Sequence, residues 1–358
     1  MNTSHSHFHA LIMAGGKGER FWPWSRETRP KQLLPLFGKK TMIEMTVDRW
    51  RAFLPAERIW IVTNAAQARQ MARLMPKFPR RNFIVEPAGR DSTGAVMLGC
   101  ATIAARDPDA VMALLPSDHL IKDTRAYLRV MSGCFAAAQR DPILMTIGIK
   151  PTCPSPCYGY IERSKPLARH ASDTIRTYRV RRFVEKPPPA KARRLVQTGR
   201  HYWNAGMFVW SAQAICEAFE KHSPIHAEGW RALQQNPRRY LAGGFLKLPK
   251  ISIDYAVMEK ARNIAMAEGA FDWDDVGLWT SLMSHLPKDS CGNCLKGQTL
   301  AVDTRNCLVL GGERMIATLG VQDLVIVQTP DATLICSAQE ASRVREIVRR
   351  LPPKSNLS

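Results

Sequence analysis

Long apolar runs are missing from this chain, and their absence excludes a class of protein. Across its 358 residues no run approaches the roughly 20 apolar residues that a membrane-spanning helix requires, so we expect no membrane partner. The opening stretch, MNTSHSHFHA, lacks the basic start and the apolar segment of a secretory signal peptide. We therefore expect a cytoplasmic protein.

A disulfide framework is also not indicated. The chain has nine cysteines, an odd number that fits a reducing compartment better than paired cystines. Two close pairs, Cys153 with Cys157 and Cys291 with Cys294, could together supply four thiolates to a zinc ion. The first spacing is loose and both pairs stand among Pro or Gly, so we expect reduced thiols and keep zinc as the alternative.

Acidic residues are scarce relative to basic ones. Lys and Arg number 51 against 31 acids, which gives a net charge of +20 and raises the question of a nucleic-acid partner. The positive charge is spread along the chain, however, with one dense run at 176–194 and no zinc-finger, RNP or helix-turn-helix signature. We expect anionic small substrates and no nucleic acid.

What the chain does contain is an alternation of short apolar runs with amphipathic stretches. In the first half we expect helices at 41–52 and 65–74, a further helix capped by Asp91 or Ser92, and strands at 9–13, 58–63, 82–85 and 110–115. This order predicts an α/β fold with a mixed, mainly parallel sheet that carries helices on both faces. Ligands of such sheets bind at the carboxyl ends of the strands.

Two changes of composition divide the rest of the chain. From about residue 143 strand-like pieces, at 144–149, 158–163, 177–184 and 203–210, alternate with helices such as 189–197 and 212–221. This order is expected for a mixed second half of the same domain. The segment 299–336 is rich in Val, Leu and Ile without a helical period, and we expect a final helix at 338–351. We therefore expect a catalytic domain at 1–285 and a small β-rich C-terminal domain at 286–358.

The loop after the first strand excludes two common phosphate-binding motifs. It reads LIMAGGKGERFWPWSRETRPKQLLPL from residue 11 to residue 36. A Walker loop needs Ser or Thr after Gly-Lys, but Gly18 follows Lys17, and a dinucleotide fingerprint needs a third glycine where Phe21 stands.

The same loop is nevertheless suited to a polyphosphate. Backbone N–H groups can approach phosphate oxygens at Gly15, Gly16 and Gly18, which have no side chains. Arg20 can grip a phosphate with its planar fork, and Lys31 can add a point charge. A glycine turn with solvated cations is the alternative.

A series of motifs in register resembles one family. AGGKGERFWPWSRETRPKQLL is similar to the signature of sugar-1-phosphate nucleotidylyltransferases, and most closely to that of mannose-1-phosphate guanylyltransferases (GDP-mannose pyrophosphorylases). The resemblance continues through EPAGRDSTGA, LLPSDH, YGYI, FVEKP, NAGMFVW, DWDDVGLW and DLVIVQTPDATLIC. It implies a Rossmann-like nucleotidyltransferase domain, then a short left-handed β-helix that supports homodimers. Longer members carry a further isomerase domain, whose activity we do not expect here.

The family's reaction joins a sugar phosphate to the α-phosphorus of a nucleoside triphosphate and releases pyrophosphate. The resemblance thus implies GTP and mannose 1-phosphate as substrates. Because the attacking phosphate is already an anion, catalysis needs alignment and charge neutralisation, and a Mg2+ ion that polarises the α-phosphate. Magnesium prefers one or two carboxylates plus phosphate and water, and the candidates are Asp118 in PSDH and Asp275 in DWDDVG. As isolated residues, both would be surface carboxylates or helix caps more often than metal ligands.

The resemblance also assigns the sugar side of the site. It gives the sugar phosphate to Lys186 and the sugar hydroxyls to Glu185, while Asn204 and Gly159 suit hydroxyl recognition with close backbone approach. A solvated Glu-Lys pair and a turn-forming Asn are the alternatives. The catalytic set implied in this way contains Arg20, Lys31, Asp118, Lys186 and Asp275.

The resemblance assigns recognition of the nucleotide base to Glu86. Its carboxylate can accept hydrogen bonds from N1–H and N2–H2 of guanine. The nucleotide-binding set also includes Leu11, Ala14 and Gly94. The family's Asn-Thr-Ala-Pro is replaced here by Asp-Ser-Thr-Gly, with Gly94 in place of proline, which puts nucleotide choice in doubt. The alternatives are another sugar phosphate, UTP or dTTP, and a non-catalytic regulatory protein that binds sugar nucleotides.

Overall fold

The computed structural model describes residues 6–167, 175–352 and 357. By compactness the chain divides into two units, each of which is discontinuous in sequence. Unit 1 comprises Met1–Gly15, Val47–Ser117 and Ile121–Trp273, and unit 2 comprises Gly16–Thr46, Asp118–Leu120 and Asp274–Ser358. The domain boundary that we expect after residue 285 separates two domains that are continuous in sequence. A division by compactness does not test it, and it stays a prediction.

Unit 1 is built on a mixed sheet of nine strands, counted over the described residues, in the order β3-β2-β1-β4-β8-β5-β9-β7-β6. The strands are β1 (Phe8–Met13), β2 (Ile59–Asn64), β3 (Phe83–Glu86), β4 (Val111–Pro116), β5 (Leu144–Ile149), β6 (Tyr160–Pro166), β7 (Thr177–Val184), β8 (His201–Ser211) and β9 (Ile264–Glu268). The first four are parallel, as the alternating pattern predicts, and β8 then joins β4 to β5 in antiparallel pairs.

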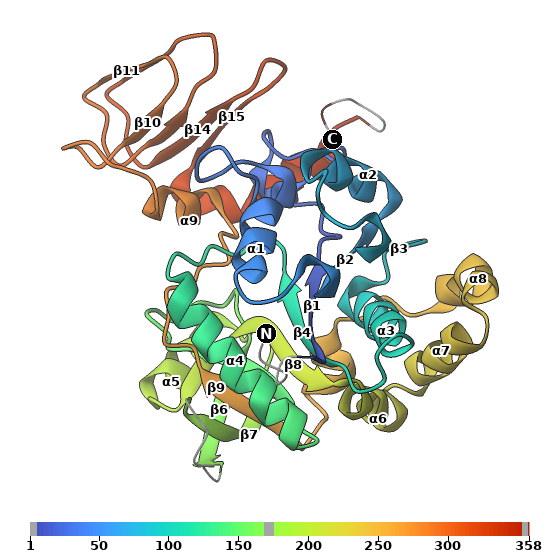
Figure 1. Ribbon diagram of the computed structural model, residues 1–358. Helices are drawn as coiled ribbons and strands as arrows, with labels where there is room; N and C mark the ends of the chain where they lie inside the picture. Colours follow the sequence, from blue (N-terminus) through green and yellow to red (C-terminus); the bar gives the residue numbers. More distant parts are fainter. Residues whose placement is uncertain (1–5, 168–174, 353–356, 358) are drawn as a thin grey trace. The chain divides into compact units, whose positions relative to one another are not determined.

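Helices cover both faces of this sheet. The helices of this part of the chain are α1 (Met42–Arg51), α2 (Ala65–Leu74), α3 (Asp91–Ala104), α4 (Thr124–Arg140), α5 (Pro189–Gln197), α6 (Ala212–His222), α7 (Pro224–Gln235) and α8 (Pro237–Arg239). Helix α4 lies on one face, whereas α3, α6 and α7 lie on the other (Figure 1). The ring of Trp50, from α1, packs edge-on against Tyr127 and Phe135 of α4.

The start of α3 differs from the expectation that Asp91 or Ser92 caps it. The helix already begins at Asp91, and the preceding Arg90 makes no side-chain cap bond. The Asp91 carboxylate instead accepts a hydrogen bond from the N–H of Ser92, and the Ser92 hydroxyl accepts one from Ile253 N–H at 2.9 Å. The hydroxyl that could have capped the helix is therefore used to hold a distant segment.

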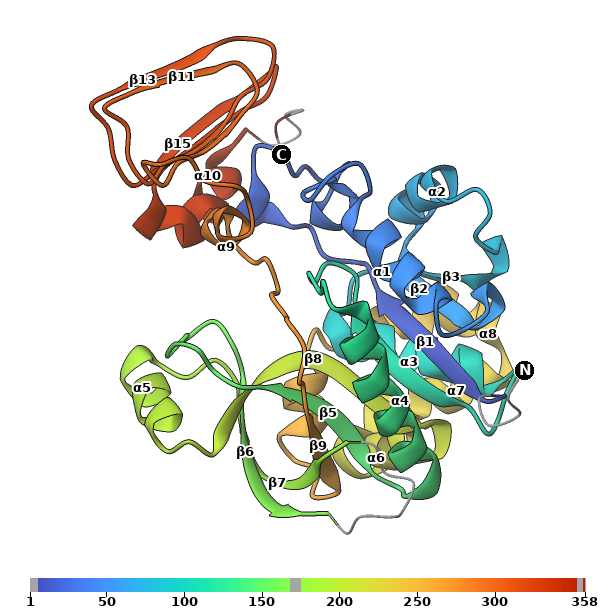
Figure 2. The same ribbon diagram turned by 60° about the vertical axis from the view of Figure 1, so that its left-hand side comes forward.

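Unit 2 contains a short β-helix. Its strands are β10 (Cys294–Lys296), β11 (Thr299–Val302), β12 (Leu308–Leu310), β13 (Ile316–Leu319), β14 (Leu324–Gln328) and β15 (Thr333–Ser337). Successive coils stack in parallel, β10 on β12 on β14 and β11 on β13, and Figure 2 shows these coils superposed. Residues with positive φ, such as Asp303, Asn306 and Gly320, lie between the strands and allow the chain to turn.

Two helices flank the β-helix, α9 (Trp279–Ser284) and α10 (Val344–Arg350). The expected final helix at 338–351 is divided, because Ala338–Arg343 forms a 3-10 segment before α10 begins. Within the described residues, no helix is long and apolar enough to cross a membrane.

Candidate active site

The glycine loop of unit 2 is shaped by close backbone approach. Gly18 has φ +66°, and a Cβ atom at this position would lie 2.5 Å from Cβ of Lys31. Only glycine accommodates both the left-handed backbone and this contact. The Gly18 carbonyl accepts hydrogen bonds from Phe21 N–H at 3.0 Å and from the Ser25 hydroxyl at 2.7 Å. The loop is therefore fixed from both sides.

The Pro-Lys-Gln stretch packs directly against this loop. Pro30 is extended and precedes a single 3-10 turn, η3 (Lys31–Leu33), in which all three residues are buried. Gln32 donates its side-chain N–H to the carbonyl of Gly16 at 3.0 Å, while Lys31 passes under Gly18. The spacing between the glycines and Pro-Lys-Gln in the sequence is thus explained by direct contact.

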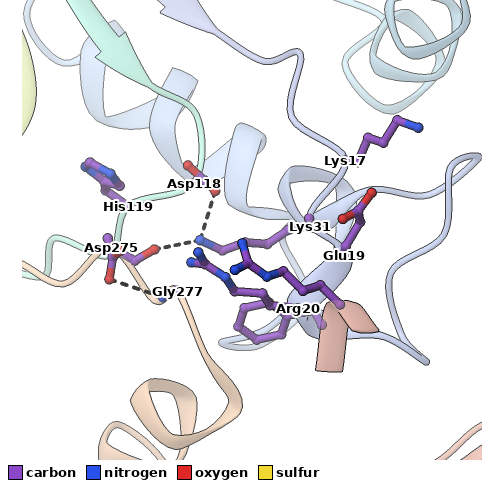
Figure 3. A pocket seen from close by; sticks show the side chains of 11 residues that line it. Lys17, Glu19, Arg20, Lys31, Asp118, His119, Asp275 and Gly277 are labelled. Carbon is purple, nitrogen blue, oxygen red and sulfur yellow. Dashed lines mark hydrogen bonds and ion pairs between the residues drawn. The ribbon is translucent and has the colours of Figure 1, made fainter. Parts of the chain in front are cut away.

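Two aspartates that are far apart in sequence enter the same cavity. Leu120 and Asp274 exchange two backbone hydrogen bonds, of 2.9 and 3.1 Å, which hold the segment after Asp118 beside the segment that carries Asp275. The Lys31 ammonium lies 2.8 Å from Oδ2 of Asp118 and 2.6 Å from the backbone oxygen of Asp275 (Figure 3). One side chain therefore contacts both aspartate residues.

The resulting cavity has a volume of about 430 Å³ and is rich in charge. Its lining residues are Lys17, Gly18, Glu19, Arg20, Phe21, Lys31, Asp118, His119, Asp275, Gly277 and Arg345. Burial alone would raise the pKa of Asp118, but the charges of Lys31 and His119 hold that pKa below its usual value. The carboxylate is therefore ionised at neutral pH.

The donor set of this cavity fits magnesium. Asp118 and Asp275 offer hard oxygen atoms, and one carboxylate oxygen of Asp275 is oriented by the N–H of Gly277 at 3.2 Å. Over the part of the chain that the structure describes, no group of three or more His, Cys, Asp or Glu side chains could hold a metal ion. A magnesium ion here would take its other ligands from phosphate and water, as it prefers. The zinc alternative for the cysteine pairs gains no support.

A second cluster, in unit 1, contains the residues assigned to the sugar. Gly159 precedes β6, Glu185 and Lys186 follow β7, and Asn204 lies in β8. The Asn204 N–H donates to the Gly159 carbonyl at 2.8 Å, and the Lys186 ammonium pairs with Glu185 at 2.5 Å. Although burial disfavours its charge, the Glu185 carboxylate raises the pKa of Lys186. The structure brings all four residues together.

Asp254 belongs to this sugar-side cluster and was not anticipated from the sequence. It begins a π-helical turn, η8 (Asp254–Met258), and accepts a hydrogen bond from the Asn204 amide at 3.0 Å. Burial and the nearby charge of Glu185 raise the pKa of Asp254 to about 7. Its stretch, SIDYAVMEK, shows no spacing that singles out one acid, so sequence reasoning had no signal to use.

Unit 1 also contains other residues of the predicted nucleotide-binding set, including Glu86, to which the base is assigned. Glu86 ends β3, is 9% exposed and lies against Gly15, since its Oε1 is 3.3 Å from where a Gly15 Cβ would be. Burial raises the pKa of Glu86 to about 7. Leu11 is buried in β1, and Ala14 donates its N–H to the Val62 carbonyl at 2.9 Å.

Gly94 lies inside α3, where a Cβ would approach Cβ of Arg90 to 2.7 Å. Its small size is therefore required by packing at the helix start. Of the cavity-lining residues in unit 2, sequence reasoning missed Lys17, Glu19, Phe21, His119, Gly277 and Arg345. His119 follows Asp118 directly and could have been included on that ground, whereas nothing in the pattern of the last helix marks Arg345.

The mixed α/β sheet, the glycine loop and a charged cavity with two carboxylates define a protein that handles a phosphorylated ligand. Comparison with known proteins agrees. Residues 9–290 match the family model for nucleotidyl transferase, and residues 297–351 match that for the MannoseP isomerase/GMP-like beta-helix domain. The chain belongs to the nucleotidyl transferase family, which confirms both the resemblance and the fold class predicted from the sequence.

Individual relatives cover almost the whole chain. It is 35% identical to the mannose-1-phosphate guanylyltransferase of Sinorhizobium fredii, with 96% of this chain and 68% of that protein aligned. It is 34% identical to the mannose-1-phosphate guanylyltransferase of Escherichia coli, with 95% and 73% aligned. A crystal structure from Thermus thermophilus, described as a mannose-1-phosphate geranyltransferase, superposes with a TM-score of 0.86 at 38% identity, covering 96% of this chain and 99% of that one.

Proposed function

We propose that this protein forms GDP-mannose and pyrophosphate from GTP and mannose 1-phosphate. The observation that carries the proposal is the convergence of the glycine loop, Lys31, Asp118 and Asp275 on one cavity. Relatives named mannose-1-phosphate guanylyltransferase support the choice of substrates. The other sugar phosphates, UTP or dTTP, and a non-catalytic binding role have no comparable support.

The chain's own residues supply alignment and charge. In unit 2 the backbone N–H groups of the glycine loop and the Arg20 guanidinium are proposed to bind the triphosphate. Asp118 and Asp275 would hold magnesium, which when bound polarises the α-phosphate. Lys31 orients both aspartates through its ammonium group. No general base is needed, because the attacking phosphate is already ionised near neutral pH.

Unit 1 is proposed to recognise the sugar of one substrate and the guanine base of the other. Lys186 would bind the phosphate of the sugar, with Glu185, Asn204 and the backbone at Gly159 reading its hydroxyls. Glu86, in its carboxylate form, would accept hydrogen bonds from two donors on the guanine edge. We also propose that the enzyme works in the cytoplasm as a homodimer, with no nucleic-acid or membrane partner.

A substrate panel tests the proposal. The purified chain is incubated with magnesium, one nucleoside triphosphate (GTP, UTP, dTTP or ATP) and one hexose 1-phosphate, and the nucleotide sugar is identified by mass spectrometry. We expect GDP-mannose to form fastest. Preference for UTP or dTTP would refute the guanylyl assignment, and the absence of any nucleotide sugar would favour a regulatory role.

A further inference from the structure

One cation of the unit 2 cavity comes from α10, the last helix among the described residues. Arg345 is exposed on α10 and lines the cavity together with Lys17, Arg20 and Lys31. Helix α10 is fixed against the glycine-loop segment, because it contacts the 3-10 turn η2 (Glu19–Phe21) and buries Val344 in the same apolar cluster as Phe21. The position of Arg345 at the cavity is therefore set by packing.

The other cations of the cavity differ in how far they are already engaged. Lys17 pairs with Glu27 at 2.6 Å, and Lys31 pairs with Asp118 at 2.8 Å. Among the described residues, Arg20 and Arg345 are the lining cations without an ion-pair partner. A nucleoside triphosphate carries roughly four negative charges at its three phosphates, so two guanidinium groups that are not held in ion pairs match its need for neutralisation.

The neighbouring Arg343 differs from Arg345, because Arg343 is held in ion pairs. Its guanidinium is held by Glu340 at 2.7 Å and by Glu346 at 3.0 Å. Arg343 and Arg345 are two positions apart in sequence, and Arg343 lies in two ion pairs. Arg345 lines the cavity and makes no ion pair among the described residues, although the charge of Glu346 acts on it at longer range.

We propose that Arg345 binds the β- and γ-phosphates of the nucleotide, and equally the pyrophosphate that leaves. The inference rests on the proposed function for the identity of the nucleotide. Contact of α10 with η2, the turn that carries Arg20 and follows Gly18, places Arg345 with the loop cations. Binding of the terminal phosphates thereby depends on a residue from the C-terminal β-helix domain.

Direct binding of inorganic pyrophosphate tests the inference. Isothermal titration calorimetry is performed on the full chain, with and without magnesium, for the wild type and for Arg345→Ala, Arg345→Lys and Arg343→Ala. We expect Arg345→Ala to weaken pyrophosphate binding at least about tenfold, as loss of a bidentate charged contact implies. Arg345→Lys should recover part of that loss, and Arg343→Ala should stay within about twofold of the wild type, since an engaged surface pair contributes little.

Forward kinetics provide a second readout. In Arg345→Ala we expect KM for GTP to rise and KM for mannose 1-phosphate to stay constant. Pyrophosphate affinity within about twofold of the wild type, or no pyrophosphate binding by the wild type, overturns the inference. If Arg345→Ala lowers the melting temperature, Arg345→Gln decides in its place. Because pyrophosphate carries neither guanine nor mannose, the binding result stands even where the substrate panel fails to yield GDP-mannose.

Discussion

Lys31 is the side chain on which the unit 2 cavity depends. It is 5% exposed, and its ammonium group holds Asp118 by charge and Asp275 through the main chain. The charge of this buried cation lowers the pKa of Asp118 and so keeps that carboxyl ionised without ligand. Sequence reasoning assigned Lys31 to phosphate alone; the structure adds contacts that orient the proposed metal ligands.

Loss of either carboxylate should abolish most of the turnover. We expect Asp118→Asn and Asp275→Asn each to lower kcat at least about a hundredfold, because an amide keeps the shape but removes the charge that would hold magnesium. Initial rates are measured over a magnesium titration. Asp109→Asn, at an exposed carboxylate, should retain the wild-type rate. Near-normal rates in either cavity variant would contradict the metal assignment.

Glu86 should make GTP binding depend on pH. Burial raises the pKa of this carboxyl to about 7, so the folded protein without ligand favours the neutral form as pH falls through that value. Guanine requires the ionised form as acceptor. The KM for GTP should therefore be constant above about pH 8 and rise as the pH is lowered below about 7.

The Glu86→Gln variant provides the comparison for this prediction. It should bind GTP at least about tenfold more weakly, since an amide offers one acceptor oxygen where the carboxylate offers two. Its KM should also lose the pH dependence between about pH 6 and about pH 8. A wild-type KM that is flat over this range would show that Glu86 does not read the base.

At the level of elements, apolar periodicity predicted most strands of unit 1 and the change to β structure near the C-terminus. It failed where tertiary contacts decide. The Ser92 hydroxyl bonds to Ile253 and so does not cap α3, and Asp254 reaches the sugar-side cluster through a π-helical turn. Such long-range partners leave no periodic trace in the sequence. Arg345 is the extreme case, because its proposed role depends on where α10 packs.

The glycine loop should respond differently at two of its glycines. Gly18→Ala forces a residue with a side chain into φ +66° and against Lys31, whereas a Cβ at Gly16 meets nothing within 4 Å. We expect Gly18→Ala to lower the free energy of unfolding by at least about 1 kcal/mol. Gly16→Ala should stay close to the wild type. Urea unfolding at equilibrium measures both, and equal stabilities would show that the loop relaxes around the added methyl group.

For the whole molecule, the β-helix presents an apolar face that bears on the proposed homodimer. Leu300, Val302 and Leu319 are 55%, 45% and 72% exposed, and β11 pairs with β13 so that Val302 lies opposite Leu319. Exposed apolar patches of this kind are typical of protein interfaces.

Charged residues introduced on this apolar face of the β-helix should therefore prevent the proposed dimer from forming. We expect the double variant Val302→Lys/Leu319→Lys to elute as a monomer in size-exclusion chromatography with light scattering, while the wild type elutes as a dimer. Leu74→Lys, at an exposed leucine of α2, serves as the control and should leave the mass unchanged. A monomeric wild type, or a double variant that remains dimeric, would contradict the proposed interface.

The two hydrogen bonds between Leu120 and Asp274 have a consequence for biosynthesis. They join stretches that leave the ribosome far apart in time, and Arg345 emerges later still. A nascent polypeptide can therefore form the first four parallel strands of unit 1, β1 to β4, long before Asp275 and Arg345 complete the proposed polyphosphate pocket. We therefore expect the growing chain to bind nucleotide in this pocket only after Asp275 and Arg345 have left the ribosome.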